Sequence, residues 1–151
     1  KQNKKPSWEG NVGSDTNKTT TGTKQTVTGD TCDAIFLFSS HVATANTAFD
    51  GGRVTLGAGV SSSEQATHAV GTRDNVDPSE TARRYMNTKA LTHIDHDGVL
   101  LVEAGLQSID ADGFTLDYST VDGGAGIFGY VTFRSRPQWL QQVIRTVYAL
   151  R

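Results

Sequence analysis

The sequence predicts an all-β fold, a single β-sandwich or jelly-roll-like domain of about eight strands. The first observation is the composition: of 151 residues, 16 are glycine, Thr and Ser are abundant, and only 36% are hydrophobic. Such a composition favours short strands joined by turns over a helical bundle. The second observation is a series of short apolar runs, separated by turns at intervals typical of a sandwich. A chain of this length can bury a core without disulfides or metal.

Residues 1–20 are predicted to form an extended N-terminal arm with little core of its own. They are polar, with Trp8 and Val12 as the only apolar anchors. Such a segment is ordered only when something holds it. Two interpretations stay open: a floppy tail, or an arm that lies on a neighbouring subunit with Trp8 as its buried anchor.

The β-sandwich domain is predicted to span residues 21–134. Its strands are expected between residues 22 and 29 and at 34–40, 53–60, 65–71, 84–93, 99–109, 114–118 and 127–133. Residues 34–40 are apolar nearly throughout, which suits a central strand. In residues 53–60 the alternation puts Arg53 and Thr55 on one face. The other face carries the apolar set Val54, Leu56, Ala58 and Val60. Residues 74–80 are expected to be an exposed loop.

The stretch 110–133 carries the strongest strand signal. An acidic turn opens it, in which we expect Gly113 to supply a positive φ. Alternation then places three apolar side chains on one face of the next strand: Phe114, Leu116 and Tyr118. The glycine-rich connection at 122–126 predicts a β-hairpin between this strand and residues 127–133.

Residues 135–151 are predicted to form a C-terminal amphipathic helix. Ser135 and Gln138 have the form of a capping box, with Pro137 early in the helix. Helical spacing places one apolar set on a single face: Trp139, Leu140, Val143, Ile144, Val147 and Tyr148. Because this segment is rich in β-branched residues, a strand over residues 138–150 stays open as the alternative. A helix of about 14 residues is marginal alone, so it must pack on its own sandwich or on a neighbour.

The run THIDHDG holds the densest cluster of potential metal ligands: His93, Asp95, His96 and Asp97. The Asp97-Gly98 pair indicates a hairpin turn, in which these side chains would splay into solvent. The later ligands of an EF-hand are missing. We therefore expect a polar turn and no metal. We expect the single cysteine, Cys32, to enter the core, because no catalytic motif surrounds it.

No motif in the sequence predicts an enzyme. No serine lies in a nucleophile elbow, no glycine-rich run has the context of a phosphate loop, and nothing singles out a carboxylate pair for glycoside hydrolysis. We therefore expect no catalytic residues and no cofactor. Arg83, Arg84 and Tyr85 could form a ligand loop for an anion or a sugar, although charges that protect a strand edge are the commoner explanation.

Charge and hydropathy exclude two classes of partner. The net charge of −2 and the pI near 6.1 give no general attraction to nucleic acid or to an anionic membrane. No apolar run approaches the roughly 20 residues of a membrane span. We therefore expect a soluble protein with neither nucleic acid nor membrane as a partner.

Five segments, in order, resemble a domain common in proteins of tailed phages and prophages: TGTKQTVTG, AIFLFSS, GRVTLGAG, ARRYMNTKAL and SIDADGFTLDYSTVDGGAGIFGYVTF. That family has a Thr-Gly-x-x-Thr-Val-Thr-Gly segment before a hydrophobic strand. It also has an Asp-Gly-Phe-Thr-Leu-x-Trp/Tyr-x-Thr-x-Asp signature before a closing strand. The resemblance spans about residues 21–133. It departs at residues 30–33, where the usual Gly-Phe-x-Pro-Lys is replaced, and after Phe133, where the family commonly stops.

The resemblance implies a component of the virion and carries over no catalytic residue. We therefore expect a structural protein, tail-associated or decorating the capsid, that binds other virion proteins and forms a homo-oligomer in a symmetric assembly. Trp8 and the apolar face of the C-terminal segment are the expected interface residues, since aromatic side chains dominate interface energies. The alternative is a module that binds carbohydrate or a host receptor, such as a host-surface glycan, through its loops and through Arg84 and Tyr85.

Overall fold

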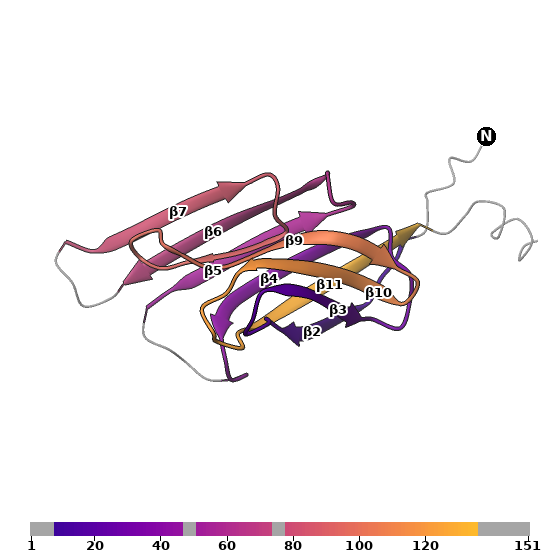
Figure 1. The fold of residues 1–151 in the computed structure, drawn as a ribbon, viewed down its shortest axis with the longest axis horizontal. Coiled ribbons are helices and arrows are strands. Elements are labelled where there is room, and N and C mark those ends of the chain that lie inside the picture. Colours follow the sequence, from indigo (N-terminus) through magenta and orange to yellow (C-terminus); the bar gives the residue numbers. More distant parts are fainter. Residues whose placement is uncertain (1–7, 47–50, 74–77, 136–151) are drawn as a thin grey trace, which may run out of the picture.

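The computed structural model describes residues 8–46, 51–73 and 78–135, which form two antiparallel sheets packed face to face (Figure 1). The larger sheet holds seven strands: β1 (Trp8–Glu9), β2 (Val12–Thr16), β4 (Ala34–Val42), β5 (Arg53–Gly59), β6 (Gln65–Arg73), β7 (Glu80–Met86) and β11 (Ile127–Ser135). The smaller sheet holds four strands: β3 (Gly22–Val27), β8 (Leu91–Ile94), β9 (Leu100–Asp110) and β10 (Gly113–Thr120). The predicted all-β sandwich is confirmed.

The strand order in the larger sheet is β1-β11-β4-β5-β6-β7, with β2 also paired to β11. The order in the smaller sheet is β3-β10-β9-β8. The described residues thus form eleven strands, three more than predicted. Two extra strands are β1 and β2. The third arises because the segment predicted as one strand at 84–93 is divided into β7 and β8, between which the chain crosses from the larger sheet to the smaller one. Glu80, expected in a loop, already belongs to β7.

The predicted hairpin between residues 114–118 and 127–133 is wrong. β10 pairs with β9 and β3, whereas β11 pairs with β4 and β2, so the glycine-rich connection carries the chain from one sheet to the other. The hairpin lies one step earlier, where Gly113 pairs with Asp110 across the acidic turn. Gly113 is not among the residues with positive φ. It is a glycine because a side chain there would collide with the backbone carbonyl of Thr26.

The N-terminal segment belongs to the sandwich for much of its length. Val12–Thr16 pair with β11, and Trp8 and Glu9 pair with the end of the same strand. Between them, Gly10 faces the carbonyl of Thr132 so closely that no side chain could be accommodated. The expected domain start at residue 21 is therefore too late, because this segment adds an edge to its own sheet.

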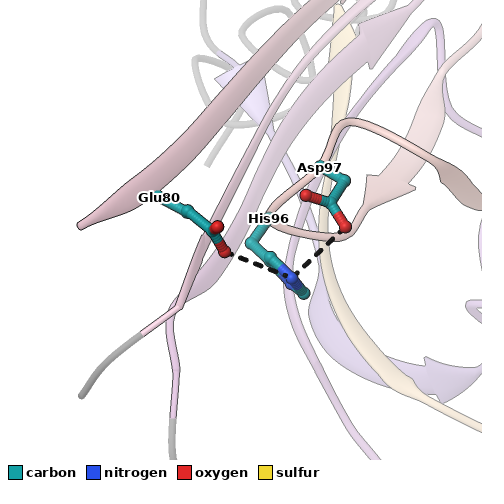
Figure 2. Close-up of side chains that lie close together, drawn as sticks. All are labelled: Glu80, His96 and Asp97. Carbon is teal, nitrogen blue, oxygen red and sulfur yellow. Dashed lines mark ion pairs between the residues drawn. The ribbon is translucent and has the colours of Figure 1, made fainter. Parts of the chain in front are cut away.

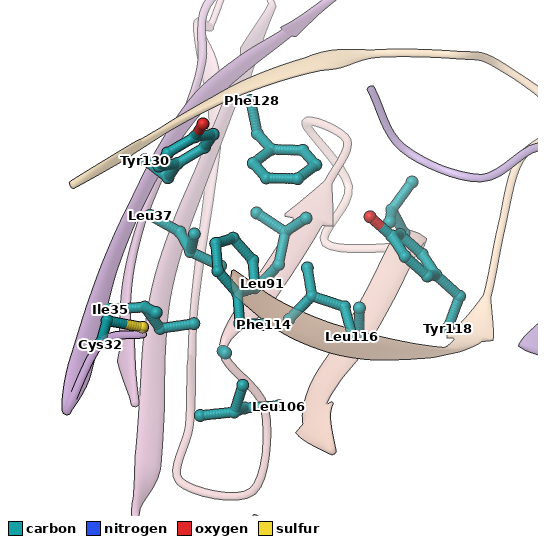
Figure 3. Close-up of a cluster of buried hydrophobic side chains, with 13 residues drawn as sticks. Cys32, Ile35, Leu37, Leu91, Leu106, Phe114, Leu116, Tyr118, Phe128 and Tyr130 are labelled. Atoms are coloured by element: carbon teal, nitrogen blue, oxygen red, sulfur yellow. The ribbon is translucent and has the colours of Figure 1, made fainter. Parts of the chain in front are cut away.

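The core lies between the sheets and is built where side chains of both alternate inward (Figure 3). The predicted shared face of Phe114, Leu116 and Tyr118 on β10 is confirmed, and it points inward, since the three residues are at most 1% exposed. The rings of Phe114 and Tyr130 pack edge to face, 5.7 Å apart. Cys32 is buried beside them, as expected. Burial and the nearby carboxylates of Asp33 and Asp110 raise its pKa, which disfavours the reactive thiolate.

The predicted C-terminal helix falls on residues 136–151 and lies outside the described residues; Ser135, its expected cap, is the last residue of β11. None of the described residues form a helix with the length and hydropathy of a membrane span.

Candidate functional site

Strand β4 is apolar on both of its faces. Ile35 and Leu37 point inward and are fully buried, while Phe36 and Phe38 alternate outward, and Phe38 is 39% exposed. A strand that is covered on both sides has this nearly continuous apolar character, whereas a strand in a two-layer sandwich needs only one apolar face. The outer side of β4 therefore carries apolar surface that the sandwich itself does not use.

The neighbouring strand β5 extends this surface. Its apolar side chains Val54, Leu56 and Ala58 are exposed, while Thr55, Gly57 and Gly59 are buried beneath them. Leu56 lies in register with Phe38, and Ala58 with Phe36, so the outward side chains of the two strands adjoin. The predicted alternation is confirmed, and the apolar set points away from the core.

We call the outward positions of four adjacent strands the outer apolar face. Its members are Ala34, Phe36, Phe38 and Ser40 of β4, Val54, Leu56 and Ala58 of β5, Ala66, His68, Val70 and Thr72 of β6, and Ile127, Gly129, Val131 and Phe133 of β11. None of these positions carries Asp, Glu, Lys or Arg. The face continues onto the flanking strands. On one side it is extended by Val12 of β2, which is in register with Val131, and on the other by Tyr85 of β7, which is in register with His68. Depletion of charge is the compositional mark of an interface core.

A shallow groove of about 470 Å³ lies at one end of the outer apolar face. Its lining includes Phe36, Ala58, Val60, Ala66 and Phe133. Gly129 lies further along the face, and a side chain there would collide with the ring of Phe38. The ring of Phe38 is thus packed over the backbone of Gly129.

The predicted ligand residues Arg83, Arg84 and Tyr85 lie on β7, the edge strand of the larger sheet. Tyr85 is 57% exposed, and its ring lies 4.7 Å from that of His68 on the outer side. Arg83 shares that side, opposite Val70. Arg84 alternates to the other side, where its guanidinium donates to the carbonyl oxygen of Gly98 at 3.4 Å. The structure therefore brings two of the three residues together.

The other predicted interface residues are mostly outside the described residues. For Trp8 the structure describes the backbone, which pairs with Ser135, and not the side chain. The six residues of the predicted apolar helix face, from Trp139 to Tyr148, all fall in the segment 136–151. Their role stays a prediction.

The predicted cluster at residues 93–97 is divided by the structure. The turn at Asp97-Gly98 is confirmed: Gly98 has φ +82°, and the backbone N–H of Asp95 donates to the carbonyl of Val99 at 3.0 Å. Asp95 stabilises this turn, because its carboxylate accepts from the N–H groups of Asp97 and Val99. The expectation that all four side chains splay into solvent is wrong for His93, which is 1% exposed, because it lies in β8 of the smaller sheet, where all four residues are buried.

His96 and Asp97 form a small surface cluster with Glu80 of β7 (Figure 2). The Nε2 atom of His96 lies 3.5 Å from Oε2 of Glu80 and 3.3 Å from Oδ2 of Asp97. The three residues have the donor atoms of a metal site, yet the Asp97 side chain is 63% exposed and Arg73 already lies 3.8 Å from Glu80. Exposed ion pairs of this kind contribute between about 0 and 1 kcal/mol each. The cluster is best described as an ion-pair network that ties the edge strand to the turn.

The outer apolar face has no sequence motif of its own, because most of its members are apolar residues that belong to no catalytic or metal-binding pattern. The signal for it is present in residues 34–38, where both alternation sets are apolar. Searches against family models, against curated proteins and against solved structures found no match for this chain. Its function is therefore argued from its own residues.

Proposed function

We propose that this chain is a non-enzymatic structural protein that assembles through protein–protein contacts made by the outer apolar face. The observation that carries the proposal is the uncharged, apolar outward side of β4, β5, β6 and β11. Water is a poor environment for such a surface, and covering it gains free energy in proportion to the apolar area removed.

The size of the face fits a specific contact. Four strands about 4.8 Å apart and about seven residues long, at about 3.3 Å per residue, cover on the order of 400 Å². Patches of about 300–600 Å² are the largest on typical monomers and are often functional. Including the flanking strands β2 and β7, the area rises to roughly 650 Å², close to the ~800 Å² that each partner contributes to a standard interface.

The setting we propose is the virion of a tailed phage, on its tail or on its capsid. The support for it is the resemblance of residues 21–133 to a domain of tailed phages and prophages. A second copy of this chain or another virion protein would cover the outer apolar face, and a symmetric homo-oligomer is the simplest arrangement.

A module that binds a host-surface glycan or receptor is the second candidate. It is favoured by one observation, the exposed Tyr85 ring stacked beside His68 with Arg83 on the same side. An aromatic ring with a nearby charged donor is a common platform for a polar ligand with an apolar face. A glycan array separates the two candidates. A saturable, sugar-specific signal that is lost in Tyr85→Ala supports the glycan-binding module, whereas the absence of any such signal supports the structural protein.

The proposed assembly is tested with a matched pair of substitutions. Val54 on the outer apolar face and Val99 in the turn before β9 are similarly exposed, 53% and 57%. A glutamate at position 54 places a charge in the contact, where it must be desolvated, and a glutamate at position 99 leaves the contact untouched. We expect sedimentation velocity to show an oligomer for the wild-type chain and for Val99→Glu, and at least tenfold weaker association for Val54→Glu. Equal association of both variants would contradict the proposal.

A further inference from the structure

Two histidines from different sheets lie side by side inside one end of the sandwich. The ring centroids of His41 in β4 and His93 in β8 are 4.4 Å apart. His93 is 1% exposed, and the side chain of His41 is 5% exposed. Neither ring takes part in the apolar core cluster. A buried pair of imidazoles requires polar partners, because an unpaired buried nitrogen is costly.

His41 reaches this position through an unusual backbone. Its φ is +57°, which is uncommon for a residue other than glycine. The register of β4 and β11 shifts at this point, so that Ile127 pairs with Val42 while Phe128 pairs with Ser39. A bulge of this kind re-aims a side chain, and backbone outliers cluster at functional sites.

Neighbouring groups fix the tautomer of each ring. Oδ2 of Asp122 lies 2.8 Å from Nε2 of His41 and can only accept, so in the neutral ring Nε2 carries the proton and Nδ1 has the lone pair. Oγ1 of Thr55 donates its one proton to the carbonyl of Thr92, 2.5 Å away. The same oxygen therefore accepts from Nδ1 of His93 at 3.0 Å, and Nε2 of His93 has the lone pair.

Both lone pairs are buried without a hydrogen-bond partner: Nδ1 of His41 and Nε2 of His93. The side chain of Asn17 is also buried without a hydrogen-bond partner. The residue is 3% exposed, and both its amide oxygen and its amide nitrogen are buried and unpartnered. A Cβ atom on Gly126 would lie 2.8 Å from Nδ1 of His41 and 3.0 Å from the Asn17 amide nitrogen. Glycine at position 126 thus keeps space between these two polar groups.

The carboxylate of Asp122 supports the His41 ring from behind. Its Oδ2 accepts from Nε2 of His41 at 2.8 Å, and its Oδ1 accepts from the backbone N–H of Gly124 at 2.9 Å. A carboxylate that accepts from the far nitrogen of a histidine is the arrangement that orients metal-binding imidazoles and increases their basicity.

We propose that His41 and His93, together with the amide oxygen of Asn17, bind a divalent transition-metal ion of the zinc class. Two imidazole nitrogens select Zn²⁺ and similar ions over Mg²⁺ and Ca²⁺, which prefer sets of oxygen ligands. The amide of Asn17 can present its oxygen by a simple flip. Such an ion would connect β4 of the larger sheet to β8 of the smaller one and stabilise that end of the sandwich.

Zinc titration of the metal-free full chain tests the proposal, because the four histidines of the chain supply their own controls. By isothermal titration calorimetry with ZnCl₂, we expect one principal site per chain. His41→Ala and His93→Ala should each weaken it at least tenfold, while His68→Ala should leave it unchanged. His96→Ala should also retain it, since that residue belongs to the surface cluster with Glu80. A site that is lost in His96→Ala and kept in His41→Ala overturns the proposal, as does a wild-type chain that binds no Zn²⁺.

Two further measurements cover the case in which the alanine variants do not fold. ¹⁵N NMR of the unmodified chain should show a proton on Nε2 of His41 and on Nδ1 of His93, with both rings shifting on addition of Zn²⁺. Either proton on the opposite nitrogen overturns the proposal. Asp122→Asn alters a partly exposed residue and should weaken Zn²⁺ binding about 10- to 100-fold. An unchanged affinity in that variant would exclude His41 as an oriented ligand.

Discussion

The two halves of the larger sheet differ in what they bury on the side that faces the core. The half formed by β4 and β11 presents large apolar side chains: Ile35, Leu37, Phe128 and Tyr130. The half formed by β5 and β6 presents small or polar ones: Thr55, Gly57, Gly59, Gln65, Thr67, Ala69 and Gly71. On the outer side both halves are apolar. Strands β5 and β6 therefore have their more apolar face directed away from the core.

Space explains the difference. Side chains at Gly57 and Gly71 would collide with the backbone carbonyls of Ala90 and Asp95, at either end of β8. A Cβ on Gly59 would lie 2.8 Å from the side chain of Leu106. The smaller sheet approaches β5 and β6 so closely that backbone meets backbone, whereas over β4 and β11 there is room for rings. Alternation tells which residues share a face, and the distance between the sheets decides which face points inward.

The largest expected effect contrasts two phenylalanines of the β4 and β11 half. Phe128 is 0% exposed in the core, and Phe38 is 39% exposed on the outer apolar face. Phe128→Ala should lower the free energy of unfolding by about 3–5 kcal/mol through lost burial and a cavity, and Phe38→Ala by about 1 kcal/mol or less. Urea denaturation of each variant, at concentrations where the chain is monomeric, measures both. Equal losses would show that the outer side is as well packed as the core.

A smaller effect is expected in the β5 and β6 half. Gly57→Ala forces a methyl group against the carbonyl of Ala90 and should cost roughly 1–3 kcal/mol, since overpacking moves backbone. Ala58→Val enlarges the next side chain, which is exposed on the outer side, and should change stability by no more than about 0.5 kcal/mol. The same denaturation experiment compares them. If Gly57→Ala were neutral, the close approach of the two sheets would not hold in solution.

Most of the strands could be predicted from the sequence, because alternation and turn residues are local signals. The partners of those strands could not. The glycine-rich connection after β10 has the composition of a hairpin turn, yet it joins two sheets, since the register of β11 is decided by β4 and β2. The break between β7 and β8 could not be predicted for the same reason, because it depends on which sheet each half joins.

The candidate sites show the same division between local and distant information. The apolar character of β4 on both sides is visible in residues 34–38 and could have indicated the outer apolar face. The histidine pair could not have been found this way, because His41 and His93 come from different sheets and meet through a bulge that no local pattern indicates. His93 and His96 are near neighbours along the chain and belong to one predicted cluster, yet the structure separates them by burial.

The smallest expected effect concerns one corner of the outer apolar face, where Phe133 ends the apolar part of β11. The backbone N–H of Ser135, and then its hydroxyl, donate to the carboxylate of Asp33 at 2.8 Å each, and these bonds lower the pKa of Asp33. A carboxyl whose pKa is lowered on folding stabilises the fold above its unfolded value near 3.8, and loses that contribution as the pH falls through its folded pKa.

Protonation of Asp33 should therefore release the end of β11 without unfolding the sandwich. Hydrogen exchange of the Ser135 amide, corrected for its intrinsic rate, should accelerate a few-fold between pH 5 and pH 2, because exposed contacts contribute about 1 kcal/mol or less. Asp33→Asn should show the faster rate already at pH 5, and Asp117→Asn, an exposed change on β10, should behave as wild type. If the Ser135 amide exchanged equally fast in wild type and in Asp33→Asn at pH 5, the Asp33 carboxylate would not stabilise the end of β11, which lies next to Phe133 at the edge of the outer apolar face.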